Sequence, residues 1–129
     1  MMETPVAVVS SSSTLAEFAR IVAAQPAISY FLVEEQGAVQ GIIAREAALK
    51  VLDQAGKSIT VGKIATTDYV TVAESSTFFD VLARMRANQA AVALVGRGAD
   101  TSVVDNIRGV ITKTQIVGSM EEAVELFTD

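Results

Sequence analysis

The sequence contains the same run of elements twice, and this repetition limits the folds that the chain can adopt. Residues 13–19 read STLAEFA, and the related stretch STFFDVL begins 63 positions after the first, at residue 76. In each stretch a threonine stands three residues before an acid, which is the spacing of a helix capping box. Apolar residues then recur at i, i+3, i+4 and i+7. The pattern predicts one amphipathic helix in each repeat, with the clearer cap at Thr14 and Glu17, because Asp80 is a shorter acid than glutamate.

A β-hairpin is predicted after each of these helices. The first β-forming runs are 28–33 and 91–95, and the second runs, VQGIIA and IRGVIT, end at residues 44 and 112. The second runs match at an offset of 68, so the second hairpin loop, 96–105, holds five additional residues. Its glycines and charges are typical of a solvated loop. A further helix closes each repeat, and the predicted order is strand, helix, strand, strand, helix, twice.

Two such repeats are expected to form one body. A single repeat of about 60 residues leaves one face of its sheet open, and two repeats can cover each other. We therefore expect an α/β (α+β) fold of two β-α-β-β-α repeats related by a pseudo-twofold axis, with the sheets packed together and flanked by helices. We expect residues 1–60 to form the first repeat, with a linker to about 63, and residues 64–129 to form the second, which ends in an acidic helix. Five side chains would lie between the sheets: Tyr30, Leu32, Ile43, Leu94 and Ile111.

The composition argues against several functions. The chain has no cysteine and no histidine, so it lacks thiolate nucleophiles, imidazole bases and the usual zinc ligands. No pair of acids has a spacing that suggests a hydrolase or a metal site, and we expect no catalytic residues and no metal. The net charge is −5, and the ten basic residues are scattered, which argues against nucleic-acid binding. No apolar run approaches the roughly 20 residues of a membrane-spanning helix, and no secretory signal is present. We therefore expect a cytoplasmic segment that does not insert into a membrane.

The second run of each hairpin and the helix after it carry a family resemblance. GIIAREAAL at 41–49 and GVITKTQIV at 109–117 resemble the signature of cystathionine-β-synthase-type (CBS) domains, which is glycine, two apolar residues, Thr or Ser, two variable residues, Asp and an apolar residue. The resemblance covers about residues 6–120 and lies in the repeated order of the pieces. It implies a tandem CBS pair, or Bateman module. Such pairs commonly sense adenine nucleotides, with the hydroxyl residue and the Asp holding ribose and phosphate.

The sequence departs from this signature at the residues that hold the ligand. In the first repeat Ala44 and Ala47 replace both of them, and in the second Thr112 is kept while Gln115 replaces the Asp. Alanine offers no hydrogen-bonding group, and glutamine offers a neutral carbonyl where a carboxylate would accept both ribose hydroxyls. We therefore expect the first cleft to be empty or structural.

The second cleft is the candidate site for ATP, ADP or AMP. Thr112 and Gln115 would bind there together with two hydroxyls from the segment that enters the second repeat, and Tyr69 would stack on a base. In the alternative interpretation, Thr112 only satisfies backbone groups and Tyr69 is partly buried core. The full candidate set is Thr66, Thr67, Tyr69, Ala93, Val110, Thr112 and Gln115.

A narrower resemblance concerns the host protein. Four stretches look like the cytoplasmic C-terminal region of bacterial voltage-gated chloride channels of the ClC family: FARIV at 18–22, FDVLARMR at 79–86, GVITK at 109–113 and EAVELF at 122–127. This resemblance implies a cytoplasmic domain of an inner-membrane protein, which biases channel gating. Its partner would be the membrane domain of the same polypeptide, in a homodimer.

Two other functions remain open from the residues. The first is a nucleotide-sensing CBS pair that stands alone or regulates an enzyme, such as inosine-monophosphate dehydrogenase. The second is a purely structural dimerisation module that uses the acidic tail helix, 120–127, as its contact. An enzyme is not expected, because no nucleophile, base or metal cluster is visible.

Overall fold

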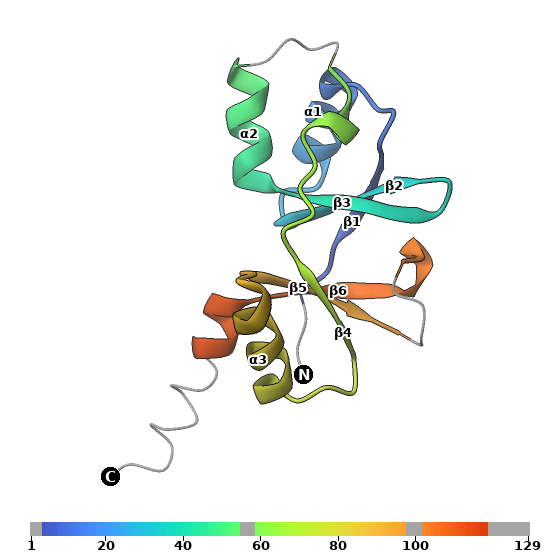
Figure 1. The fold of residues 1–129 in the computed structure, drawn as a ribbon. Coiled ribbons are helices and arrows are strands. Elements are labelled where there is room, and N and C mark those ends of the chain that lie inside the picture. Colours follow the sequence, from blue (N-terminus) through green and yellow to red (C-terminus); the bar gives the residue numbers. More distant parts are fainter. Residues whose placement is uncertain (1–3, 55–58, 98–101, 119–129) are drawn as a thin grey trace. The chain divides into compact units, whose positions relative to one another are not determined.

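The computed structural model describes residues 4–54, 59–97 and 102–118, which divide into two compact units (Figure 1). The N-terminal unit contains residues 5–54, 59–67 and 102–106. The C-terminal unit contains residues 4, 68–97 and 107–118. The predicted repeat boundaries, 1–60 and 64–129, and the pseudo-twofold packing of the repeats stay predictions. The predicted tail helix at 120–127 lies outside the described residues.

The N-terminal unit is a three-stranded sheet with two helices. Its strands have the order β1-β2-β3, with β1 parallel to β2 and β2 antiparallel to β3. In chain order the elements are β1 (Ala7–Ser10), α1 (Leu15–Ala24), β2 (Tyr30–Glu35), β3 (Ala38–Ala44), α2 (Arg45–Gln54) and the short 3-10 helix η1 (Val61–Lys63).

The C-terminal unit repeats this arrangement. Its sheet has the order β4-β5-β6, again with one parallel and one antiparallel pair. The elements are β4 (Val70–Ala73), α3 (Phe78–Asn88), β5 (Val92–Gly96) and β6 (Ile107–Thr112), and residues 113–118 are helical. The predicted order of strand, helix, strand, strand, helix is therefore confirmed in both repeats. The fold is mixed α/β, with two three-stranded sheets and flanking helices. No helix in the described ranges is long and apolar enough to cross a membrane.

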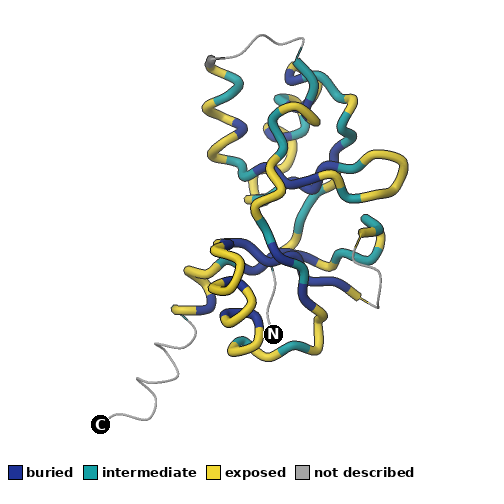
Figure 2. The backbone as a smooth tube through the Cα atoms, viewed as in Figure 1, coloured by how far each residue is buried: buried dark blue, intermediate teal, exposed yellow. Residues whose placement is uncertain are grey.

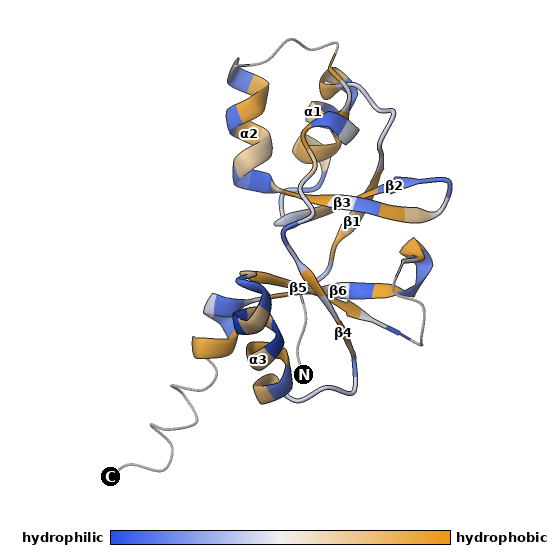
Figure 3. Ribbon diagram, viewed as in Figure 1, coloured by the Kyte–Doolittle hydropathy of each residue, from blue (hydrophilic) through white to orange (hydrophobic). Residues whose placement is uncertain are grey.

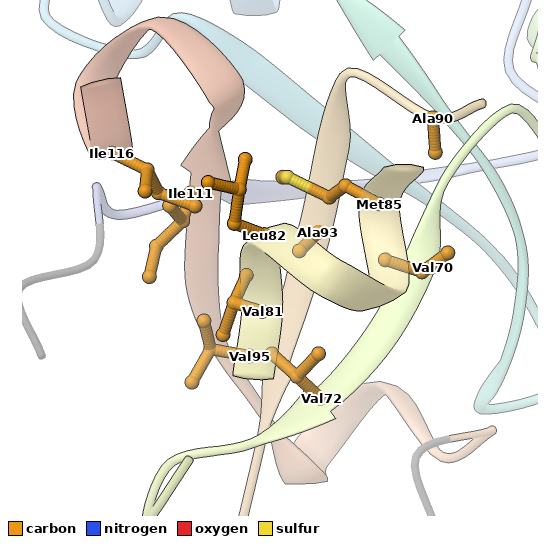
Figure 4. Packing of buried hydrophobic residues seen from close by; sticks show 10 residues of the cluster. All are labelled: Val70, Val72, Val81, Leu82, Met85, Ala90, Ala93, Val95, Ile111 and Ile116. Carbon is orange, nitrogen blue, oxygen red and sulfur yellow. The ribbon is translucent and has the colours of Figure 1, made fainter. Parts of the chain in front are cut away.

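Each unit has its own apolar core between its sheet and its helices. In the N-terminal unit Phe18 of α1 meets Phe31 of β2 edge to face, with ring centroids 5.1 Å apart. The core of the C-terminal unit joins α3 to alternate residues of the strands (Figure 4). Buried residues lie mainly along the strands, and the middle strand β5 is both buried and hydrophobic throughout (Figures 2 and 3). Side chains alternate between the two faces of each strand, so every second residue, such as Ala93 and Val95 of β5, faces the helix and joins the core.

This alternation corrects one prediction. Ile43 and Ile111 were expected between the two sheets, but each packs into the core of its own unit. Their neighbours Ile42 and Val110 point to the opposite face of the sheet, because successive side chains of a strand alternate. Both neighbours are also buried.

The helix caps differ from the expectation as well. Thr77 and Asp80 form the complete capping box, in which Asp80 N–H donates to Thr77 Oγ1 at 3.2 Å and Thr77 N–H donates to Asp80 Oδ2 at 3.4 Å. At α1 the structure records one half of this box, the Glu17 N–H that donates to Thr14 Oγ1 at 3.3 Å. The prediction that the first cap is the clearer one is wrong. The shorter acid loses less side-chain freedom when it turns back on the helix.

The end of the second hairpin loop pairs with the first hairpin. Val39 N–H donates to Ser102 O at 2.7 Å, and Val104 N–H donates to Gly37 O at 2.9 Å. Residues 102–106 thus pair with the hairpin of the N-terminal unit and belong to that unit. The glycine-rich and charged composition of the loop did not predict this pairing.

Candidate functional site

The candidate site of the C-terminal unit begins where β6 ends and the helix at 113–118 starts. Gln115 N–H donates to Thr112 Oγ1 at 3.2 Å. In return Gln115 Oε1 accepts from Thr112 N–H at 2.9 Å and from the Thr112 hydroxyl at 3.3 Å. These contacts are a capping box with glutamine as its third helical residue. Thr112 therefore satisfies backbone groups, as in the alternative interpretation, and the two signature residues are held together by direct hydrogen bonds.

The Gln115 side chain also binds the start of the chain. Its Nε2 donates to Thr4 Oγ1 at 2.7 Å. Thr4 in turn lies against β6, because its backbone N–H donates to Val110 O at 2.8 Å and its O accepts from Val110 N–H at 2.8 Å. Sequence analysis did not find Thr4, which is separated from Gln115 by 111 positions. The Thr112-x-x-Gln115 spacing, by contrast, is a capping signature that the sequence does carry.

Three further candidates lie on the same sheet. Val110 is buried in β6, and its backbone groups hold Thr4. Ala93 of β5 pairs with Val70 and belongs to the core cluster (Figure 4). Tyr69 immediately precedes β4 and is partly buried, and this burial raises the pKa of its phenol. The C-terminal unit therefore gathers Val110 with the capping box at the end of β6, while the Ala93 side chain packs in the core.

The two remaining candidates, Thr66 and Thr67, are exposed residues of the N-terminal unit. Thr66 pairs with Ile42 of β3 through two backbone hydrogen bonds of 2.9 Å. The preceding residue, Gly41, permits this approach, because a methyl group there would lie 2.7 Å from Thr66 O. The signature glycine thus brings the segment at 65–67 against β3. A shared site between these threonines and Thr112 stays a prediction.

The N-terminal unit has a hollow at the corresponding end of β3. Its volume is about 230 Å³, and its lining residues are Ser29, Tyr30, Ala44, Arg45 and Glu46. Ala44 occupies the position that Thr112 has in the second repeat, so no hydroxyl ends this strand. Ligand pockets usually measure roughly 300–1,000 Å³, which makes this hollow a small one.

Arg45 fills a structural role beside this hollow. Its Nη1 donates to Gln25 O at 2.8 Å and to Ile28 O at 3.1 Å, and its Nη2 donates to Val22 O at 2.8 Å. The guanidinium thereby joins the start of α2 to the end of α1 and the turn after it, where Val22 O and Gln25 O also accept backbone N–H groups. Three of its five N–H groups are therefore committed to the fold. No pattern in the sequence pointed to this contact, and the empty or structural first cleft stays a prediction.

The described residues contain no cluster of three or more acidic side chains that could hold a metal ion. The hydrogen-bonding groups at the end of β6 are neutral hydroxyl and amide groups, which suit sugar hydroxyls and amide edges of a small molecule.

Comparison with known proteins gives this arrangement a family. The model of the CBS domain matches the chain twice, over residues 1–54 and over residues 61–122. The chain belongs to the CBS domain family. It is a tandem pair of CBS domains, and the signature glycines Gly41 and Gly109 lie in corresponding strands of the two domains. No curated protein matches the sequence.

Several solved structures share the fold of this pair. An uncharacterized conserved protein from Pyrococcus horikoshii is 17% identical, with a TM-score of 0.65 over 92% of this chain and 87% of that one. The CBS domain of a bacterial CNNM/CorC family Mg²⁺ transporter, in complex with ATP, is 19% identical, with a TM-score of 0.66 over 94% and 83%. The cytosolic domain of the Mg²⁺ channel MgtE, in complex with ATP, is also 19% identical, with a TM-score of 0.63 over 88% of this chain and 44% of that one. At these identities the likeness concerns the fold.

Proposed function

We propose that this CBS pair is a regulatory module that binds an adenine nucleotide, ATP, ADP or AMP, at the end of β6. The observation that carries the proposal is the pairing of the Thr112 hydroxyl with the Gln115 amide at the strand end. Two similar solved structures, from a Mg²⁺ transporter and a Mg²⁺ channel, are complexes with ATP, which supports a nucleotide as the ligand class. The nucleotide would regulate an attached protein by shifting the module between conformations. The size of this shift is set by how much more tightly the nucleotide binds one conformation than the other.

The proposed contacts imply weak binding. The Thr112 hydroxyl and the Gln115 amide would meet the ribose hydroxyls, and Tyr69 would stack on the base. Exposed Lys113 next to the cap would attract phosphate. A hydrogen bond between neutral groups contributes about 0.5–1.5 kcal/mol, against about 1.5–3 kcal/mol when one partner is charged. We therefore expect an affinity roughly tenfold below that of a pair with a carboxylate at position 115.

Calorimetric titration with AMP, ADP and ATP tests this function. Gln115→Asp restores a charged acceptor, and the Thr77–Asp80 box of α3 shows that an aspartate can cap a helix from this position. We expect this variant to bind about tenfold more tightly than wild type. Thr71→Val, a substitution on β4 of the same unit, is the control and should leave the nucleotide affinity at the wild-type value. No heat from any nucleotide, with either wild type or Gln115→Asp, would refute the function.

We also propose a membrane protein as the host, and within this class a ClC-type chloride channel. The stretches at 18–22 and 79–86 resemble such channels, and the two ATP complexes named above come from membrane transport proteins. The partner is then the membrane domain of the same polypeptide, on the cytoplasmic side of the inner membrane. Sequencing the flanking gene region tests the host. A reading frame that continues upstream into a chloride-channel domain supports it, and one that continues into a Mg²⁺ transporter or an enzyme contradicts it.

A homodimer is proposed for the assembled module. Sedimentation of the chain with and without residues 120–127 tests the dimer and its contact together. A monomer at all concentrations would contradict the dimer. If the chain without residues 120–127 still forms a dimer, this segment is not the dimer contact. The alternative of a purely structural module that dimerises through this segment would then be excluded.

A further inference from the structure

Residue 4 occupies the edge of β6 that faces away from β5. Two backbone hydrogen bonds of 2.8 Å join Thr4 to Val110, and the Thr4 hydroxyl accepts a third from Gln115 Nε2 at 2.7 Å. The isolated bridge with Val110 is a single residue pair, so no neighbouring pair of this kind extends it in the described chain. The side-chain hydrogen bond therefore adds to the two backbone hydrogen bonds that hold Thr4.

Hydrogen bonds within the cap hold the Gln115 amide in one orientation. Gln115 Oε1 has two acceptor positions, and it receives both the Thr112 N–H and the Thr112 hydroxyl proton. The Thr112 oxygen accepts from Gln115 N–H and gives its one proton to Oε1. Of the polar atoms of the Gln115 side chain, Nε2 alone reaches out of the capping box, and it points to Thr4. Nε2 gives one of its two N–H groups to Thr4, and a ligand that turns the Gln115 amide toward itself breaks this contact.

We propose that Thr4 and a bound nucleotide compete for the Gln115 amide, so that binding at the end of β6 releases residue 4 from the strand edge. This inference rests on the proposed function and adds to it the element that responds. Because coupling between two sites is reciprocal, holding residue 4 in place weakens nucleotide binding by the same factor by which the nucleotide weakens the docking of residue 4. The substitution of glutamine for the signature aspartate makes this contact possible in its observed form, since a carboxylate has no N–H to donate.

Thr4→Val isolates the side-chain contact. Valine has nearly the same shape, keeps the two backbone bonds to Val110 and removes the acceptor of the Gln115 amide. Loss of one neutral hydrogen bond should raise the affinity for AMP or ATP by about 2- to 10-fold. Thr71→Val makes the same chemical change on β4 and should leave the affinity unchanged.

Amide hydrogen exchange followed by NMR gives a second measurement. In the free wild-type protein the amides of Thr4 and Val110 are both hydrogen-bonded. Saturating AMP or ATP should accelerate exchange at the amide of residue 4. In free Thr4→Val this amide should already exchange faster than in wild type, by about 2- to 10-fold, and Thr71→Val should show the wild-type rate.

The outcomes separate the inference from the proposed function. A nucleotide that binds but leaves exchange at residue 4 unchanged or slower overturns the release. Equal affinities of Thr4→Val and Thr71→Val overturn the competition. If no nucleotide binds to any variant, the proposed function and the release are both wrong, and exchange in free Thr4→Val still decides whether the Gln115 amide holds residue 4.

Discussion

Replacing Arg45 by methionine should destabilise the first repeat, because it removes three hydrogen bonds to main-chain carbonyls at the end of α1 and in the turn after it. Two of its three hydrogen bonds, to Val22 O and Ile28 O, lie in partly buried surroundings, while the bond to Gln25 O is exposed and water can replace it. A hydrogen bond from a charged donor contributes about 1.5–3 kcal/mol. Taking the low end for the two partly buried bonds and nothing for the exposed one, we expect a loss of about 3 kcal/mol in the free energy of unfolding.

The second repeat supplies the matched control. Lys113 stands at the position equivalent to Arg45, at the offset of 68, and its side chain is exposed. Lys113→Met should change stability by less than about 0.5 kcal/mol, as is usual for a surface substitution. Arg45→Lys should fall between the two, since it keeps the charge but cannot reach three carbonyls with one planar fork.

Urea unfolding followed by circular dichroism measures the difference. At about 4 °C per kcal/mol for a chain of this size, Arg45→Met should also lower the thermal midpoint by roughly 12 °C. If Arg45→Met and Lys113→Met unfold at the same urea concentration with the same slope, the guanidinium does not stabilise α1. The explanation of Arg45 as a structural residue would then be wrong.

Three further predictions follow from the caps, a glycine and a buried phenol. Thr77→Val and Thr14→Val should each cost about 1 kcal/mol in urea unfolding, because each removes the hydroxyl that accepts a backbone N–H in the first turn of its helix; no cost at either position would contradict this. Gly41→Ala should cost about 1–3 kcal/mol, since a methyl group there would lie 2.7 Å from a backbone oxygen, whereas Gly118→Ala meets no atom within 4 Å and should cost nothing. Burial raises the pKa of Tyr69 above its usual 10.0, so the unfolded chain loses the phenolic proton first and stability falls as the pH rises from about 10 through the folded pKa. Urea melts at about pH 8 and about pH 10.5 measure this loss of stability, and Tyr69→Phe should lessen it. The same loss in wild type and Tyr69→Phe would show that the Tyr69 phenol does not cause it.

The order of the elements could be predicted because it depends on short-range patterns. The apolar spacing behind Thr14 and Thr77 specifies helices within two turns, and the β-forming residues around Gly41 and Gly109 specify strands within six residues. These patterns also fixed the duplicated architecture. The face on which Ile43 and Ile111 lie was mispredicted, because alternation gives two faces and does not say which one the helices cover.

The candidate site was predictable only in part. The Thr112-x-x-Gln115 spacing could have been interpreted as a helix cap, since the same spacing was used at Thr14 and Thr77. The contact of Gln115 with Thr4 had no such signal, because the two residues are separated by 111 positions and only the path of the chain brings them together.

Residue types at fixed short spacings were enough to predict two copies of one α/β unit, the resemblance of both copies to the CBS signature, and the departures from it: the first copy lacks the hydroxyl and the acid, and the second lacks the acid. The partners of Arg45 and Gln115 became known only from the folded chain. Arg45 donates to main-chain carbonyls, and every residue has a carbonyl, so its partners leave no mark in the sequence. The same holds for residue 4, which becomes part of the candidate site because its backbone pairs with the open edge of β6.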